Sequence, residues 1–175
     1  IRCEVDENFE HLAELASIYG DTMDRTGAGD DLRFNEEYFR RLVSELGDQA
    51  IHYVCFDADD EMVGASIYLR GSSFLNAHLG GSRSGMGLIS PATLETETAR
   101  SHGRSLGLDH LNLGGGVGGA DDGLMAFKRG FSETTAPFQV WRWIVDADRY
   151  VQLSSGFFPA YRNPKTATSK YRTDE

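Results

Sequence analysis

"AIHYVCFDADDEMVGASIYLR", residues 50–70, decides the fold class. Two apolar runs rich in β-branched and aromatic residues flank the acidic turn at Asp57–Asp60, and this pattern predicts two strands joined as a hairpin. "SFLNAHLGG", residues 73–81, follows directly and predicts a third strand. Three strands in succession predict a mixed sheet with antiparallel pairing, because a doubly wound parallel sheet would alternate strands with helices throughout.

The segments before the hairpin predict one short strand and two helices. "IRCEV", residues 1–5, reads as a strand, and the apolar residues from Phe9 to Met23 recur at helical spacing. "FNEEYFRRLVSELG", residues 34–47, carries a complete set of helix signals, with Asn35 as the N-cap and Gly47 as the end. Both helices therefore precede the central strands.

The segments after the third strand alternate between helix and strand. Pro91 favours a helix start, and that helix is expected to run to about Leu106. "DHLNLG", residues 109–114, predicts a short strand, and Asp121 or Asp122 is expected to cap a short helix. "FQVWRWIV", residues 138–145, predicts a last strand.

The predicted order is therefore β-α-α-β-β-β-α-β-α-β, an α/β (α+β) fold with a mixed, mostly antiparallel sheet flanked by helices. We expect a single domain over residues 1–153 and a polar C-terminal tail over 154–175. No apolar run approaches the roughly 20 residues that a membrane span needs.

Composition narrows the possible functions. The chain has 175 residues and a formal net charge of −10, with the acidic excess in the first 60 residues. Such a chain is not a general nucleic-acid binder, because phosphate neutralisation needs clustered lysine and arginine. Cys3 and Cys55 are too few and too separated for a disulfide scaffold or a zinc knuckle. The five histidines lack metal-ligand spacing, so no metal is expected.

"LGGGVGGADDGLMAFKRGF", residues 113–131, is the motif with the most functional content. Gly114, Gly116 and Gly119 satisfy the dinucleotide-binding pattern G-x-G-x-x-G, but too little chain follows for the β-α-β unit that such a site needs. Two other interpretations remain open. Bare main chain at the end of a strand can form a slot for a substrate, or the glycines simply allow a wide turn.

Element order and motif together resemble the GNAT-fold acyltransferases. The segment "HLNLGGGVGGADDGLMAFKRGFS", with "SPATLETETARSHGRSLG" before it and "FFPAYR" after it, looks like the C-terminal half of the FemAB-like, peptidoglycan interpeptide bridge-forming branch. The resemblance implies transfer of an acyl or aminoacyl group to an amine, from acyl-CoA or from aminoacyl-tRNA. It also implies a cytoplasmic enzyme, a small-molecule or cell-wall-precursor acceptor, and an upstream second GNAT-like half.

The resemblance assigns roles to particular residues. The Phe-Lys pair of the family maps onto Phe127 and Lys128, which are the candidate catalytic residues. Amide formation passes through a tetrahedral oxyanion, and an ammonium can stabilise that charge. His78 and Tyr68 are considered as proton carriers. The candidate donor-binding or substrate-binding residues are Gly114, Gly115, Gly116, Gly118 and Gly119, together with Arg83, Gly85 and Gly87.

The loop containing Arg83 departs from the family pattern. "SRSGMGLISP", residues 82–91, is one residue short of the Q/R-x-x-G-x-G/A loop that holds the CoA pyrophosphate in GNAT enzymes. A helix N-terminus favours anions all the same. Because the loop departs from the pattern, the first alternative prediction is a GNAT-like domain that has lost catalysis and only binds a partner. The second alternative is dinucleotide binding at the glycine run.

Overall fold

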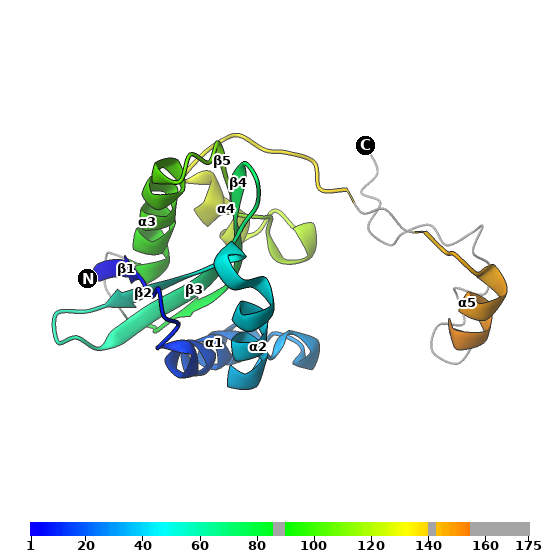
Figure 1. The fold of residues 1–175 in the computed structure, drawn as a ribbon, viewed down its shortest axis with the longest axis horizontal. Coiled ribbons are helices and arrows are strands. Elements are labelled where there is room, and N and C mark those ends of the chain that lie inside the picture. Colours follow the sequence, from blue (N-terminus) through cyan, green and yellow to red (C-terminus); the bar gives the residue numbers. More distant parts are fainter. Residues whose placement is uncertain (86–89, 140–142, 155–175) are drawn as a thin grey trace. The chain divides into compact units, whose positions relative to one another are not determined.

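The computed structural model describes residues 1–85, 90–139 and 143–154. The chain divides into two compact units, Ile1–Ser132 and Glu133–Glu175. The first unit contains one five-stranded sheet in the order β1-β2-β3-β4-β5 (Figure 1). Its strands are β1 (Arg2–Val5), β2 (Ala50–Phe56), β3 (Met62–Arg70), β4 (Phe74–Ser82) and β5 (His110–Asn112), and its α-helices are α1 (Leu12–Thr26), α2 (Glu36–Leu46), α3 (Pro91–Ser105) and α4 (Gly123–Arg129).

The strand pairing confirms the predicted mixed sheet. Strands β1 to β4 pair with their neighbours in antiparallel fashion, and β2 and β3 form the expected hairpin. Strand β5 pairs with β4 in parallel, since α3 carries the chain back across the sheet. The fold class read from residues 50–81 is therefore correct.

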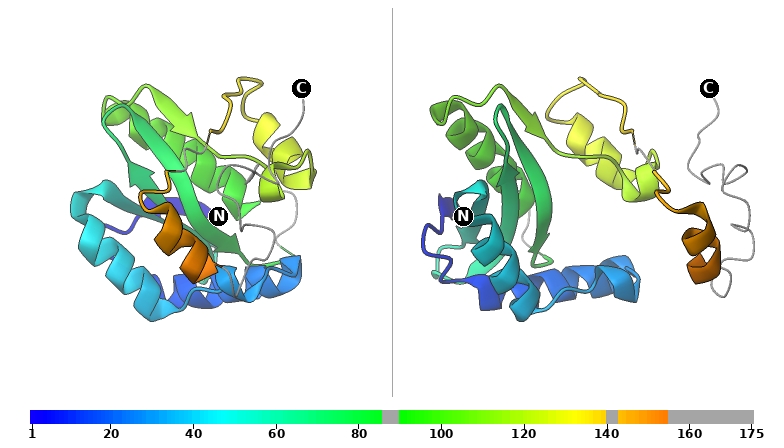
Figure 2. Two further views of the ribbon diagram at one scale, coloured as in Figure 1. Left: turned by 90° about the vertical axis from the view of Figure 1, so that its right-hand side faces the viewer. Right: turned by 45° about the vertical axis from the view of Figure 1, so that its right-hand side comes forward.

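Helices cover both faces of the sheet (Figure 2). Along β2, Val54 packs into a core cluster with residues of α1 and α2, such as Leu15 and Phe39. Its neighbour Tyr53 points to the other face, where it packs in a cluster with Ala99 of α3. Every residue of β2 is buried because both faces are covered, which explains its continuous apolar sequence.

The helix ends follow the local signals in the sequence. The Asn35 side chain accepts a hydrogen bond from the Tyr38 amide at 3.0 Å, and Gly47, at φ +54°, ends α2. The start of α1 is held differently, because Asp6 accepts hydrogen bonds from the amides of Glu10 and His11. Asp6 comes directly after β1, so one carboxylate ties the first strand to the first helix.

The second unit departs from the prediction. Of the expected strand at 138–145, residues 140–142 lie outside the described residues, and the described ones belong to no strand. Phe138 and Val145 are 92% and 91% exposed, so neither has the burial that stabilises a sheet strand. A helix that the sequence pattern did not predict, α5 (Ala147–Ser154), follows. The limit between domain and tail, placed at residue 153, remains a proposal.

No helix in the described part of the chain is long and apolar enough to cross a membrane.

Candidate functional site

Strands β4 and β5 separate soon after they meet. Their parallel pairing covers only three residue pairs and ends where Asn76 lies opposite Asn112. The Asn112 side chain marks the fork, because its amide nitrogen donates to Asn76 Oδ1 at 2.8 Å while its Oδ1 accepts the Gly114 amide at 2.9 Å. Strand β4 continues for six more residues to Ser82. Within the described residues, no strand pairs with that part of its outer edge.

Burial shows that this part of β4 is open. The neighbouring strand β3 is buried from Met62 to Tyr68, whereas β4 is half-buried or exposed from Asn76 to Ser82. An unpaired strand edge offers N–H and C=O groups to an extended molecule. The fork can therefore accept a linear ligand beside β4.

A β-bulge lies in the open part of β4. Ile67 pairs with Leu79 and Tyr68 with Ala77, which leaves His78 as the extra residue. Bulges redirect a side chain and are frequent beside active sites. The His78 side chain reaches solvent, but neighbouring atoms remove part of the water around its ring. This desolvation lowers the pKa of His78, which favours the neutral imidazole. This placement supports its consideration as a proton carrier.

The end of β4 lies beside a polar cavity of about 440 Å³, lined by Asp21, Asp24, Arg25, Arg83 and Ser84. The Arg25 guanidinium donates to the Ser82 carbonyl at 3.0 Å, and Arg83 Nε donates to the Met62 carbonyl at 2.9 Å. Asp24 is paired with Arg33. The predicted Arg83 thus stands at the end of β4, while Gly85 follows it at φ +80°. Gly87 lies outside the described residues.

The glycine run folds back on itself. Asp122 accepts the amides of Val117 and Met125, both at 2.9 Å, so it joins the run to the start of α4. A Cβ on Gly116 would lie 2.1 Å from the Ala120 carbonyl oxygen, so only glycine fits there. Gly114 and Gly119 adopt positive φ. Gly118 lies in the same 3₁₀ turn as Gly119. The run is therefore a folded turn with much of its main chain already bonded.

Lys128 closes this turn. Its ammonium donates to the Gly115 carbonyl at 2.6 Å and lies 3.6 Å from the position of a Cβ on Gly114. Burial lowers the pKa of Lys128, although Asp122 opposes the shift. Phe127 is half-buried and packs edge to face with Phe131, their ring centroids 5.2 Å apart. The structure thus brings Lys128 and the glycines together. In the described part of the chain, no hydrogen bond or ion pair joins them to Arg83.

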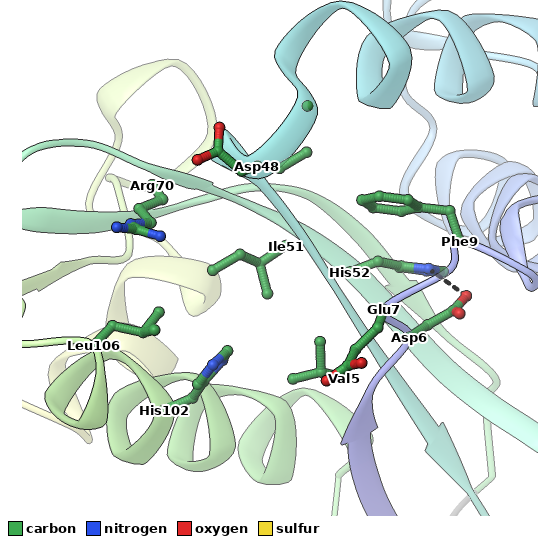
Figure 3. A pocket seen from close by; sticks show the side chains of 12 residues that line it. Val5, Asp6, Glu7, Phe9, Asp48, Ile51, His52, Arg70, His102 and Leu106 are labelled. Carbon is green, nitrogen blue, oxygen red and sulfur yellow. Dashed lines mark hydrogen bonds and ion pairs between the residues drawn. The ribbon is translucent and has the colours of Figure 1, made fainter.

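A second cavity, of about 390 Å³, lies at the β1 side of the sheet (Figure 3). His52 Nδ1 lies 3.1 Å from Asp6 Oδ2 at one end of this cavity, and Arg70 and His102 lie at the other end with Ile51 between them. Burial lowers the pKa of His52 despite the opposing effect of Asp6. The Asp6 carboxylate already accepts hydrogen bonds from the amides at the start of α1, so we interpret the Asp6–His52 pair as structural. None of the predicted site residues that the structure describes lines this cavity.

Among the described residues, no cluster of three or more histidine, cysteine or carboxylate side chains could hold a metal ion.

Comparison with known proteins agrees with the fold. A family model described as "Acetyltransferase (GNAT) domain" matches residues 1–129. No curated protein matches the sequence significantly.

Solved structures with a similar fold include several acetyltransferases. A GNAT family acetyltransferase of Staphylococcus aureus has a TM-score of 0.54 and 10% identity, covering 81% of this chain and 98% of that chain. A predicted acetyltransferase from Clostridium acetobutylicum, solved with acetyl-CoA, has a TM-score of 0.57 and 7% identity, covering 82% and 96%. An aminoglycoside acetyltransferase from an uncultured soil sample has a TM-score of 0.53 and 15% identity, covering 83% and 99%. At these identities the likeness shows the fold alone.

Proposed function

Because the chain belongs to the GNAT acetyltransferase domain family, we propose that it transfers an acyl group from an acyl-CoA thioester to the nitrogen of a small-molecule amine. The observation that carries this proposal is the unpaired edge of β4 beyond the fork with β5. The pantetheine arm of CoA is linear and carries amide groups, so it has the hydrogen-bonding groups that a strand edge can pair with. The C. acetobutylicum protein with a similar fold was solved with acetyl-CoA.

The proposed chemistry needs no covalent enzyme intermediate. The amine nitrogen attacks the thioester carbonyl, a tetrahedral oxyanion forms, and the carbon–sulfur bond breaks to release CoA as a thiol. The protein must orient the two reactants and accept the proton of the amine. We assign the proton-accepting role to His78, whose lowered pKa keeps the imidazole neutral near pH 7. We propose that Arg83 and Arg25, which line the cavity at the end of β4, bind the diphosphate group of the donor.

The finer predictions from the FemAB resemblance remain predictions. These are the aminoacyl-tRNA donor, the tRNA contact, the cell-wall-precursor acceptor and the second GNAT-like half. The dinucleotide interpretation has less support, since β5 is followed by a 3₁₀ turn and then by the seven-residue α4.

A transfer assay tests the proposed function. Purified protein is incubated with radiolabelled acetyl-CoA or aminoacyl-tRNA and a panel of primary amines, and labelled amide is counted. We expect amide from acetyl-CoA, and we expect His78→Ala to lower kcat by about 10²- to 10⁴-fold, the usual contribution of a general base. If amide forms from aminoacyl-tRNA but not from acetyl-CoA, the donor is aminoacyl-tRNA and not acyl-CoA. No product from either, with the fold intact, would favour a binding domain that has lost catalysis.

Lys128 is tested by a variant that keeps its length but removes its charge. If its ammonium leaves Gly115 to stabilise the oxyanion, Lys128→Met is expected to lower kcat about 10²- to 10³-fold with little change in KM. Arg129→Met is the matched control, because Arg129 is the next residue along α4 and its guanidinium pairs with Asp121 on the surface. An unchanged kcat in Lys128→Met, with an intact fold, would leave Lys128 as only a support for the glycine turn.

A further inference from the structure

Strand pairing brings the two cysteines of the chain together. Cys3 of β1 lies directly opposite Cys55 of β2, although 51 residues separate them in the sequence. Opposite residues of an antiparallel pair have Cα atoms about 4.5–5.5 Å apart, and disulfides form at Cα separations of about 4.4–6.8 Å. Both side chains belong to the face of the sheet that α3 covers. Cys3 and Cys55 are free thiols in this structure.

Helix α3 places an acidic side chain over this pair. Gly64 of β3 is the next residue across the sheet from Cys55, and a Cβ there would lie 2.6 Å from Pro91 Cβ and 2.7 Å from Glu95 Oε1. The missing side chain at Gly64 therefore lets the first turns of α3 approach the sheet closely. Glu95 is 4% exposed, and within the described residues its Oε1 has no hydrogen-bond partner. A buried carboxyl oxygen without a hydrogen-bond partner is costly and calls for an explanation.

The two thiols differ in a way that suits a stepwise reaction. Cys3 is half-buried, and the adjacent Cys55 thiol lowers the pKa of Cys3 although burial opposes the shift. Cys55 is fully buried, lies 3.8 Å from the Pro91 carbonyl, and has a raised pKa because Cys3 and burial both favour its thiol. Cys3 is thus the accessible thiol with more thiolate character, and reactivity follows the thiolate.

We propose that Cys3, Cys55 and Glu95 form a redox site in which a hydroperoxide converts the two opposed thiols into a disulfide between β1 and β2. The Cys3 thiolate attacks the outer peroxide oxygen, the O–O bond breaks, and the alkoxide takes the proton that Cys3 released. Cys3 is then a sulfenic acid. Cys55 gives its proton to the Glu95 carboxylate, and its sulfur attacks the sulfur of Cys3. The S–S bond forms, and hydroxide leaves as water with the proton from Glu95.

The overall reaction consumes two thiols and one hydroperoxide and yields one disulfide, one alcohol and one water. Burial raises the pKa of Glu95 to about 7, so a substantial share of its side chain is carboxylate at neutral pH and can accept the proton. The titratable groups around Glu95 are Cys3 on β1, Cys55 on β2 and Tyr68 on β3, and Glu4 lies near Cys3. The disulfide would fasten β1, which lies at the edge of the sheet and pairs with β2.

The reaction is followed on the full chain by intact mass and peptide mapping. Reduced protein is treated with hydrogen peroxide and quenched with an alkylating agent. We expect the mass to fall by two hydrogens, a Cys3–Cys55 cross-linked peptide, and reversal by dithiothreitol. The backbone amides of β1 should exchange their hydrogens with solvent more slowly once the cross-link has formed. The Tm should also rise, because a disulfide restrains the unfolded chain. Stable oxidation of Cys3 without a cross-link, a linked dimer, or unreacted thiols would each overturn the proposal.

Variants separate the steps. In Cys55→Ala the sulfenic acid on Cys3 should persist and be trapped by dimedone, whereas Cys3→Ala should leave Cys55 unmodified. Glu95→Gln should slow the cross-linking step about tenfold or more while Cys3 forms sulfenic acid at the wild-type rate. Glu97→Gln, on the same helix but at the surface in a pair with Arg100, is the control and should change neither rate. Equal cross-linking rates in the Glu95→Gln variant and wild type would remove Glu95 from the site.

Discussion

Replacing Glu95 by glutamine is expected to raise the free energy of unfolding by about 3 kcal/mol at pH 8 and to leave it nearly unchanged at pH 4. Glu95 is 4% exposed, and burial raises its pKa from 4.5 to about 7. The folded state therefore holds the proton more tightly than the unfolded state does. Glutamine resembles the protonated form and loses nothing when the pH rises.

The direction follows from proton linkage. Below pH 4.5 the carboxyl group is protonated in both states, so it imposes no pH-dependent penalty. Between about pH 4.5 and pH 7 the unfolded state releases the proton first, and the stability of the wild-type protein falls as the pH rises. Above about pH 7 the loss is complete and the difference between variant and wild type becomes constant. Other groups titrate as well, so the informative quantity is this difference.

Urea unfolding of both proteins from pH 4 to pH 8, under reducing conditions, measures the difference. Glu97→Gln is again the control, because its carboxylate lies at the surface of the same helix in an ion pair with Arg100. A difference between Glu95→Gln and wild type that stays the same across the pH range would show that Glu95 is not held in a raised-pKa environment.

Replacing Gly81 by alanine is expected to destabilise the protein by about 1–3 kcal/mol, the usual cost of forcing extra atoms into a packed site. A Cβ on Gly81 would lie 2.8 Å from the Ile18 carbonyl oxygen and 2.7 Å from Thr22 Oγ1. The first of these atoms is backbone of α1 and cannot rotate away. Helix α1 must then move away from β4. The cavity at the end of β4 is lined partly by α1, so weaker binding of acyl-CoA should accompany the loss of stability.

Gly20, which lies in α1 itself, provides the matched glycine-to-alanine control. A Cβ there meets nothing within 4 Å, so Gly20→Ala is expected to stabilise the protein by about 0.5–1 kcal/mol through helix propensity. Thermal unfolding of the two variants beside wild type measures both effects. A Gly81→Ala variant as stable as Gly20→Ala would show that α1 does not contact β4 closely.

The sequence predicted the fold well where local chemistry decides the structure. The hairpin at Asp57–Asp60, the cap at Asn35 and the stop at Gly47 were all confirmed, because each depends on residues within a few positions. The cap at Asp122 was confirmed for the same reason. Sequence pattern also located the strand that carries the proposed site, β4.

Long-range relations were beyond the sequence. Nothing local shows that β4 and β5 separate after three pairs, or that Cys3 faces Cys55, since both depend on strand register between distant segments. The burial of Glu95 also depends on a distant element, because the missing side chain at Gly64 of β3 leaves the space that its carboxyl group occupies.

Binding of acetyl-CoA at the open edge of β4 is the most direct consequence of the proposed function. Uniformly ¹⁵N-labelled protein is titrated with acetyl-CoA, and backbone amide shifts are mapped onto the sheet. We expect saturable shifts across residues 77–82 and at Arg83, with smaller effects at β1. Shifts confined to the glycine turn at 114–119, or no shifts at millimolar acetyl-CoA, would show that β4 does not bind the donor.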